Sequence, residues 1–286
     1  MKIKSYFNFK NYKILFLNLT VAAIAILWFI PTLALLISSF RNQNEIYSSG
    51  WWNFLIDSRS FTFDNYKSVI LHKGIGTAFV NSLIITGPAV LLTVLLSAMA
   101  AFPLAFLKIN GSRIIILTIV ALQAVPIQIT LIPVLKMLNS LGLGGSFPAV
   151  WLAHTAYGIP FSVYLLRNFF ISVPFSLIEA AMIDGANRAH IFFKIVLPLS
   201  LPAIASLAIF QFLWVWNDLL VALAYLGGSE NVAPLTVKMA SMKGSLESGW
   251  HIMAASAFIS MVLPLAIFLF FQRYFISGIT AGAVKQ

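Results

Sequence analysis

The chain has 286 residues, of which 60% are hydrophobic and only 9% are charged, and it contains no cysteine. Soluble globular domains contain about 25% charged residues, so this composition excludes a water-soluble globule. The missing thiols exclude disulfides and thiolate sites, and the net charge of +10 in so apolar a chain indicates orientation in a bilayer and contact with anionic headgroups rather than nucleic acid.

The first element follows a basic segment, residues 1–13, which we expect to be cytoplasmic. An apolar run from Ile14 to Ser38 comes next. This run is too long for the core of a signal peptide, and no small-residue cleavage site clearly follows it. We therefore expect a retained transmembrane helix over residues 14–39.

Five further segments are long and apolar enough to cross a bilayer, which takes about 20 helical residues. A polar and aromatic stretch with turn residues, 40–76, separates the first two spans. The prediction is an all-α membrane domain over residues 14–276, followed by a cytoplasmic tail, 277–286. The six predicted spans cover residues 14–39, 77–107, 114–138, 148–171, 203–226 and 252–276.

Lysine and arginine counts orient these spans. With the N-terminus inside, the cytoplasmic segments hold eleven of these residues and the outside segments hold six, while Lys136 lies near a helix end. Cytoplasmic loops carry the excess of positive charge, so both termini are expected in the cytoplasm. Prolines within the predicted spans are expected to kink the helices, because each removes a backbone hydrogen bond. They are Pro31, Pro88, Pro126, Pro133, Pro160 and Pro264.

A polar stretch, EAAMIDGANRAHIFFKIVLP at residues 179–198, lies between the fourth and fifth spans. Ser176 and Glu179 have the spacing of a capping box, so a helix is expected to begin near Ser176. Gly185 suits a left-handed helix end, and Asn187 suits the cap of a second helix that ends at Leu197, before Pro198. The segment is either an amphipathic connector on the membrane surface or a docking element for a soluble partner.

This stretch resembles the cytoplasmic loop of binding-protein-dependent ABC importer permeases. There Glu-Ala-Ala is followed after three residues by Gly and after nine more by Ile-x-Leu-Pro. FVNSLIIT (79–86), LGLGGSFPAVWLAH (141–154) and IPFSVYLLRNFFISVP (159–174) are similar to carbohydrate-importer permeases, above all to the shorter subunit of maltose-type and α-glucoside-type systems. The positions that match the loop pattern are Glu179, Ala180, Ala181, Gly185, Ile195, Leu197 and Pro198.

The resemblance implies a type I ABC importer permease core of six transmembrane helices, with coupling helices between spans four and five. These coupling helices would bind in a groove on an ATPase subunit, and Asp184 would be one of the contact residues. The tail GITAGAVKQ (278–286) also resembles the family, although the family usually ends this stretch in Lys-Gly rather than Lys285-Gln286. Its residues Gly278, Gly282 and Lys285 would add contacts with the ATPase.

The partners that the resemblance implies are a homologous second permease, two ATPase subunits and an extracytoplasmic sugar-binding protein, assembled at the bacterial inner membrane. The ATPase subunits would bind ATP and magnesium, and this chain would bind no cofactor. The implied substrate is an α-glucoside, a related oligosaccharide or a compatible solute.

WVWNDLL (214–220) contains the only acidic residue well inside a predicted span, Asp218. An uncompensated carboxylate there costs about 2.5–3.5 kcal/mol. Either the segment lines a sugar path, or it forms a polar clamp between helices or between permease subunits. The candidate path residues are Trp214, Trp216, Asn217 and Asp218.

We expect interhelical hydrogen bonds from Asn81, Gln123, Gln128 and Thr130, and a structural role for His154.

The predicted outside loop, residues 232–250, has two interpretations. It is a solvated hairpin, or, as the resemblance implies, it probes the cleft of the binding protein and helps to displace the sugar. The candidate contact residues are Met239, Ala240, Ser241, Met242, Lys243 and Gly244.

No enzyme is expected, because the sequence has no phosphate-binding Gly-Lys-Ser/Thr loop, no metal cluster and no nucleophile paired with a base. Two other classes compete with a permease of an ATP-driven importer. A secondary transporter or channel would work without an ATPase. An intramembrane enzyme would need a polar mate for Asp218 at the same depth.

Overall fold

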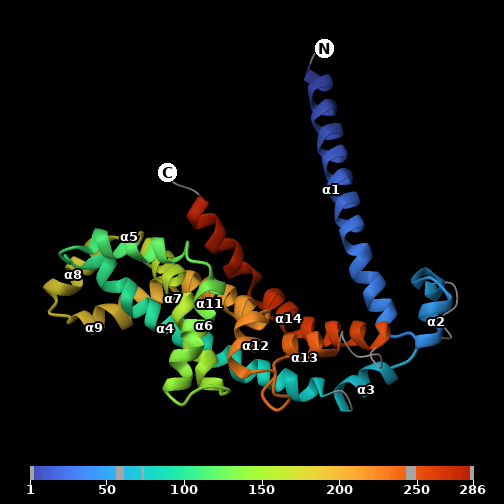
Figure 1. Ribbon diagram of the computed structural model, residues 1–286. Helices are drawn as coiled ribbons and strands as arrows, with labels where there is room; N and C mark the ends of the chain where they lie inside the picture. The colour runs from blue at the N-terminus through green and yellow to red at the C-terminus, as the bar shows by residue number, and fades with distance from the viewer. Residues whose placement is uncertain (1–2, 56–60, 72–73, 243–248, 284–286) are drawn as a thin grey trace. The chain divides into compact units, whose positions relative to one another are not determined.

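The computed structural model describes residues 3–55, 61–71, 74–242 and 249–283, and over these ranges the chain is helical (Figure 1). The described backbone contains no named strand, only an isolated bridge between Arg41 and Phe61. The chain divides into two compact units. The N-terminal unit is Met1–Lys73 with Met242–Ile259, and the core unit is Gly74–Ser241 with Ser260–Gln286.

The N-terminal unit begins with the long helix α1 (Ile3–Ser39), followed by α2 (Gln43–Ser48), the 3-10 helix η1 (Trp51–Leu55) and α3 (Asp64–Leu71). The stretch 40–76, predicted as polar and aromatic with turns, thus contains three short helices. Two of its polar side chains, Arg41 and Asn65, are buried.

Arg41, only 3% exposed, organises this stretch. Its guanidinium donates hydrogen bonds to the backbone carbonyls of Glu45 and Gly50 at 2.9 and 3.2 Å. The side-chain amide of Asn65 on α3 donates to the carbonyls of Ser39 and Arg41, both at 2.9 Å. These bonds satisfy carbonyl groups that irregular backbone would otherwise leave unpaired, and so they hold the short helices in place.

The core unit contains the remaining helices, and α14 begins in the N-terminal unit and ends in the core unit. α4 and α7 form its most extensive helix pair, and α11 packs against both. The helices are α4 (Ile75–Phe106), α5 (Ser112–Leu122), α6 (Ile127–Ser140), α7 (Phe147–Ile171), α8 (Phe175–Ile183), α9 (Arg188–Ile191), the π-helix η3 (Phe192–Val196), α10 (Leu197–Leu199), α11 (Leu201–Trp216), α12 (Leu220–Leu226), α13 (Leu235–Met242) and α14 (Trp250–Ala283).

Gly158 permits the close packing of α7 with α4 and α11. A Cβ atom at this position would lie 2.9 Å from both the Gln211 Oε1 atom and the Thr93 Cγ2 atom. These distances are shorter than van der Waals contact, so no side chain larger than hydrogen fits without displacing its neighbours. Small residues at such crossings are what lets membrane helices approach one another closely.

Four described helices are long and apolar enough to cross a membrane, within α1, α4, α7 and α14. Two bent helix pairs raise the number to six if each pair is one span. α5 and α6 meet at 100°, and the segment Arg188–Leu199 meets α11 at 76°. The all-α membrane fold is therefore confirmed, whereas the exact number of spans stays a prediction.

Proline positions only partly mark the breaks. Pro126 is the N-cap of α6 and lies at the 100° bend. Pro31, Pro88, Pro133, Pro160 and Pro264 instead remain inside helices. The predicted spans 114–138 and 203–226 are each interrupted, at Gln123–Pro126 and at Asn217–Leu219.

Candidate functional site

The predicted polar stretch folds as two helices joined by a turn, which we call the helix–turn–helix segment (residues 175–199). α8 ends at a Schellman motif around Gly185, which has φ +81°. The Gly185 N–H donates to the Met182 carbonyl at 3.1 Å, and the Ala186 N–H donates to the Ala181 carbonyl at 2.9 Å. Glycine adopts this left-handed conformation at little steric cost, which confirms the predicted stop.

The second half of the segment begins at Asn187, whose Oδ1 atom accepts a hydrogen bond from the His190 N–H at 2.8 Å. This N-cap was predicted and is confirmed. The predicted end was wrong. The helix passes through the π-helix η3 and ends at Leu199, because Pro198 lies at the start of α10, where its missing N–H costs no hydrogen bond.

The predicted capping box was also wrong. α8 begins at Phe175 with Pro174 as its N-cap, and no side chain accepts a capping hydrogen bond. Ser176 therefore lies one residue inside the helix and cannot take the N-cap position. Pro174 fixes an extended entry into the helix, and this backbone preference outweighs the side-chain pattern.

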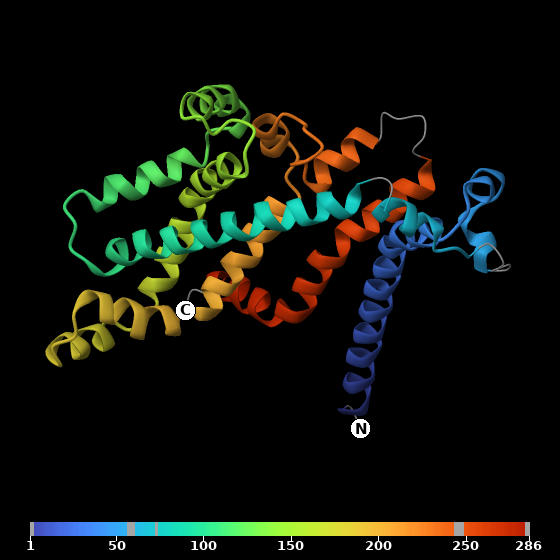
Figure 2. The same cartoon turned by 90° about the horizontal axis from the view of Figure 1, so that it is seen from below.

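The helix–turn–helix segment is anchored by apolar residues to the core unit. Ile178, Ala181, Ile191, Phe192 and Val196 belong to one buried cluster with residues of α4, α7 and α11. Figures 1 and 2 place α8 and α9 together at one end of this unit. The segment is therefore closely packed against these three helices.

The turn itself is exposed. Glu179, Ala180, Asp184 and Gly185 are solvent-accessible, and Ile183 next to them is 85% exposed. Beside the turn lies a hollow of about 410 Å³, lined in part by Asp184, Gly185 and His190. The turn therefore presents an apolar side chain at the surface, while the other apolar face of the segment is buried.

Sequence reasoning missed Ile183 and Met182 as candidate contact residues. The available signal was two apolar residues in the last turn of α8, separated from the predicted glycine stop only by Asp184. Of the other predicted positions in the segment, Ile195 and Leu197 are half-buried and Pro198 is exposed.

In the WVWNDLL segment the two tryptophans have different surroundings. Trp216, only 3% exposed, stacks on Phe212 with the ring centroids 5.4 Å apart, and its indole N–H donates to the Ser260 carbonyl at 3.0 Å. Trp214 meets the His154 ring edge-on at 5.2 Å. Trp216 therefore ties α11 to α14, while Trp214 is half-buried and lines a hollow beside α7.

Asp218 lies in the break between α11 and α12. Its Oδ1 and Oδ2 atoms accept hydrogen bonds from the N–H groups of Val221 and Ala222 at 3.3 and 2.9 Å. Its Oδ2 atom also lies 3.6 Å from the Nε2 atom of the fully buried His154. The carboxylate thus caps α12, and this favours the polar clamp; a role in a sugar path stays a prediction.

Replacing Asp218 with alanine is expected to lower the free energy of unfolding by about 1 kcal/mol, because α12 loses its cap. The Asp218→Asn variant keeps one acceptor oxygen and should lose less than half as much. Thermal unfolding of the purified chain in detergent measures both losses. Equal losses in the two variants would show that the charge next to His154, rather than the cap, is the stabilising feature.

The predicted outside loop contains a helix, α13, so of its two interpretations the simple hairpin is wrong, and contact with a binding protein stays a prediction. α4 holds α13: the side-chain amide of Asn81 donates to the carbonyls of Asn231 and Ala233 at 2.9 and 3.1 Å, and Ser82 Oγ accepts from the Leu235 N–H at 2.9 Å. Met239, Ala240, Ser241 and Met242 lie in its last turns, whereas Lys243 and Gly244 lie outside the described residues.

At the start of this region, the exposed carboxylate of Glu230 accepts a hydrogen bond from the Lys238 ammonium at 2.7 Å. This bond, together with the positive charge, holds the pKa of Glu230 below its usual range. Because Glu230 is fully accessible to water, the pair contributes little to stability.

Interhelical hydrogen bonding is confirmed for one of the predicted polar residues. The Thr130 hydroxyl donates to Tyr157 Oη at 3.0 Å, and Tyr157 Oη lies 2.8 Å from Tyr225 Oη. This chain joins α6, α7 and α12. Asn81 bonds to the loop before α13 instead of to a helix, because that loop folds back onto α4.

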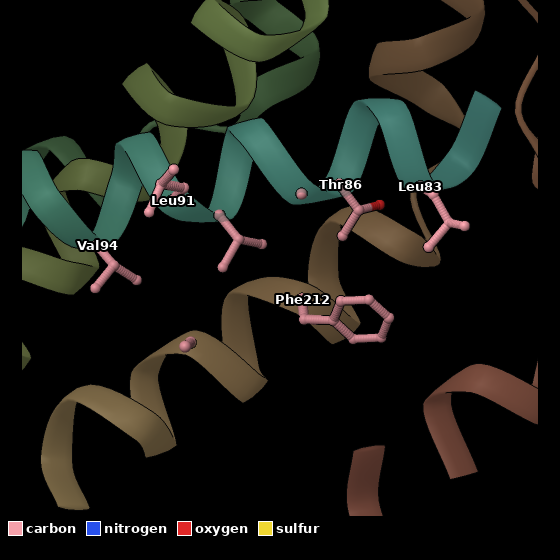
Figure 3. A pocket seen from close by; sticks show the side chains of 8 residues that line it. Leu83, Thr86, Leu91, Val94 and Phe212 are labelled. Atoms are coloured by element: carbon pink, nitrogen blue, oxygen red, sulfur yellow. The ribbon is translucent and has the colours of Figure 1, made fainter. Parts of the chain in front are cut away.

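A groove of about 290 Å³ runs between α4 and α11 (Figure 3). Apart from Thr86 its lining is apolar, with Leu83, Leu91, Val94 and Phe212 among the side chains.

Elsewhere, Gly278 and Gly282 lie in the last turns of α14, and Lys285 lies outside the described residues. Among the described residues no three His, Asp or Glu side chains gather to hold a metal ion.

These features define a class: a multi-pass helical membrane protein whose core helices carry an exposed, rigidly anchored helix–turn–helix segment. Residues 93–280 match the family described as the binding-protein-dependent transport system inner membrane component. The chain belongs to this family, and the resemblance to binding-protein-dependent ABC importer permeases is confirmed.

Several relatives are similar over most of the chain. The osmoprotective compounds uptake permease protein GgtD of Synechocystis sp. is 47% identical, covering 94% of this chain and 92% of the relative. The alpha-glucoside transport system permease protein AglG of Rhizobium meliloti is 44% identical over 79% of this chain, a match that spans 60% of the relative. The melibiose/raffinose/stachyose import permease protein MelC of Bacillus subtilis is 33% identical, with 94% and 96% covered.

The fold also matches a solved structure. A chain of a bacterial ABC transporter involved in the import of the acidic polysaccharide alginate superimposes with a TM-score of 0.76, covering 96% of this chain and 98% of that chain at 21% identity. This likeness establishes the transmembrane fold of an ABC importer subunit.

Proposed function

We propose that this chain is a permease subunit of an ATP-driven importer of an α-glucoside, a related oligosaccharide or a compatible solute. It forms half of the translocation path beside a homologous second permease, and it binds two ATPase subunits and an extracytoplasmic sugar-binding protein. The names of GgtD, AglG and MelC support this substrate class. The chain has no catalytic residue or cofactor of its own, and both termini lie in the cytoplasm.

The main support for the proposal is the structure of the helix–turn–helix segment. Its turn is exposed at Ile183 and Gly185, while its opposite side is packed into the cluster that includes α4, α7 and α11. Closure of the ATPase subunits displaces the turn, and the packed side carries this displacement to the transmembrane helices. Rigid-body movement of these helices opens the path alternately to the two sides of the membrane.

Sugar reaches the path from the binding protein. The segment Met239–Met242 ends α13, which Asn81 and Ser82 hold against α4. We place this end of α13 at the outside, where it contacts the loaded binding protein and favours release of the sugar. The tail with Gly278, Gly282 and Lys285 lies on the cytoplasmic side and adds contacts with the ATPase subunits.

Replacing Ile183 with glutamate is expected to reduce the ATPase that co-purifies with the tagged permease at least ten-fold. A buried unpaired charge would replace an apolar contact, and a ten-fold change corresponds to about 1.4 kcal/mol. The matched control is Asn110→Glu, which adds the same charge at an exposed position in the predicted cytoplasmic turn after α4.

Co-purification is measured with the complete set of subunits, together with ATP-dependent uptake of labelled sucrose, maltose and trehalose into proteoliposomes. Full recovery of the ATPase with Ile183→Glu would contradict docking through this turn. Uptake by the wild-type chain without any ATPase would instead favour a secondary transporter or channel.

A further inference from the structure

Two hollows adjoin each other in the core unit, apart from the helix–turn–helix segment. One, of about 390 Å³, is lined by residues of α5, α6 and α7, including Gln123 and Thr130. The other, of about 290 Å³, is lined by α7 and α11, including Gln211 and Trp214. Tyr157 and Phe161 line both hollows, so side chains from four helices converge on one place.

The first hollow lies at a broken membrane helix. α5 and α6 meet at 100°, and the N-cap position of α6, Pro126, supplies no side-chain hydrogen bond. Helix ends leave backbone N–H and carbonyl groups without intrahelical partners. Such ends persist at membrane depth where they line a cavity, and broken helices in transport proteins mark substrate sites. Gln123, Val125 and Ile127 at this break line the hollow.

Gln211 belongs to the wall of the second hollow, and its side chain is enclosed. Gln211 is only 4% exposed, and its Nε2 atom donates to Ser162 Oγ at 3.0 Å. Its Oε1 atom has no hydrogen-bond partner among the described residues. Leaving a buried acceptor unpaired costs about 1–3 kcal/mol. This oxygen is packed against Gly158, so the polar groups that a ligand can reach are Gln123 and Thr130 of the first hollow.

The lining of the two hollows selects the ligand's chemistry. Aromatic rings come from Tyr157, Phe161, Phe210 and Trp214, and neutral polar groups from Gln123, Gln211 and Thr130. No Asp, Glu, His, Lys or Arg lines either hollow in the described chain. A charged ligand would lose its hydration without gaining a counter-charge. A ligand that has many hydroxyls and an apolar face can both bond to the neutral polar groups and stack on the aromatic rings.

We propose that the two hollows form a carbohydrate-contact site of this subunit, which takes a neutral sugar. The rings of Phe161 and Trp214 stack on sugar faces, and Gln123 and Thr130 pair with hydroxyl groups. This inference rests on the proposed import of sugars, but it adds which residues of this chain touch the sugar and that the sugar is uncharged.

The absence of cysteine from the chain allows a direct test. Gln123→Cys, at an exposed position, and Phe161→Cys place single thiols in the hollows, and Leu91→Cys places a control thiol in the apolar groove between α4 and α11. The complete transporter in proteoliposomes is treated with a water-soluble methanethiosulfonate reagent, and labelling of this chain is followed by mass spectrometry.

Saturating sucrose, maltose or trehalose is expected to slow labelling of Gln123→Cys and Phe161→Cys at least five-fold for whichever sugar is transported, and to leave Leu91→Cys unchanged. Glycine betaine and glucuronate should protect none of the thiols. Transport of a sugar without protection of either reporter would overturn the proposed site and leave the proposed function standing. Equal protection by glycine betaine or glucuronate would overturn the proposed selectivity of the site for neutral sugars.

Labelling and uptake are measured separately, so the two proposals fail independently. If the wild-type complex transports none of the sugars with ATP, the proposed function fails, and protection of the thiols still decides whether the site binds sugar. Should Phe161→Cys not assemble, Gln123→Cys carries the test, because its side chain makes no contribution to the buried core.

Discussion

Replacing Gly185 with alanine is expected to reduce ATP-dependent uptake about ten-fold while leaving the chain inserted and folded. Gly185 has φ +81°, and the left-handed conformation costs other residues about 1–2 kcal/mol. That cost corresponds to a factor of about 5 to 30 in the population of the native turn. A Cβ atom at Gly185 would meet nothing within 4 Å, so the loss would come from the backbone conformation and not from a clash.

The expected order of uptake is wild type, then Gly185→Asn, then Gly185→Ala, since asparagine tolerates the left-handed region better than alanine. Gly111 provides the matched control. It has the same φ of +81° and the same open surroundings, but it lies at the N-cap of α5. Gly111→Ala should lose similar stability and keep most of its uptake.

Uptake into proteoliposomes, ATPase recovery and thermal unfolding are measured for all three variants and the wild type. If Gly111→Ala and Gly185→Ala lose uptake equally, the effect reflects general stability, and the turn has no special part in transmitting movement. Gly185 is a sharper probe than Glu179, because its left-handed conformation closes the Schellman motif, in which its own N–H bonds to Met182 and the next N–H, of Ala186, bonds to Ala181.

Replacing Gly158 with alanine is expected to lower the free energy of unfolding by about 1–3 kcal/mol, and replacement with leucine should prevent recovery of folded protein. The added Cβ would lie 2.9 Å from Thr93 Cγ2 on α4 and from Gln211 Oε1 on α11. Relief of these contacts requires the Gln211 side chain to rotate and α7 to move away from Thr93 on α4. Thermal unfolding of the purified chain in detergent measures the effect.

Gly87 on α4 provides the control for this substitution. It lies within a helix, as Gly158 does, but a Cβ there would meet nothing within 4 Å of the described chain. Alanine is a better helix former than glycine by about 0.8–1.0 kcal/mol, so Gly87→Ala should be neutral or stabilising. If Gly158→Ala were also neutral, the three helices would have more freedom to separate than their packing indicates.

Features that depend on neighbouring residues could be predicted from the sequence. Long apolar runs predicted the helices within α1, α4, α7 and α14. Gly185 and Asn187 predicted the end of one short helix and the start of the next, because a left-handed glycine and a capping amide act over three or four residues. The loop pattern between Glu179 and Pro198 identified the family, which the comparisons confirm.

Other features required the tertiary structure. The spans 114–138 and 203–226 contain no sequence signal strong enough to separate a kink from a break, since Pro133 stays within a helix while Pro126 lies at the 100° bend. Asp218 had no obvious partner in the sequence, and only folding brings it next to His154 on α7, whereas its bonds to the first N–H groups of α12 are local. The capping box failed because Pro174 took the N-cap position.

The sequence by itself therefore determined the membrane class, the positions of the long helices and the exposed turn at Gly185. Only the tertiary structure decided which polar groups are paired, which leave an acceptor open, as Gln211 does, and where α7 approaches its neighbours at Gly158. The physical reason is the distance along the chain between the residues that interact. Helix formation and capping depend on residues within one or two turns, whereas hydrogen-bond satisfaction and close packing depend on residues far apart in the chain.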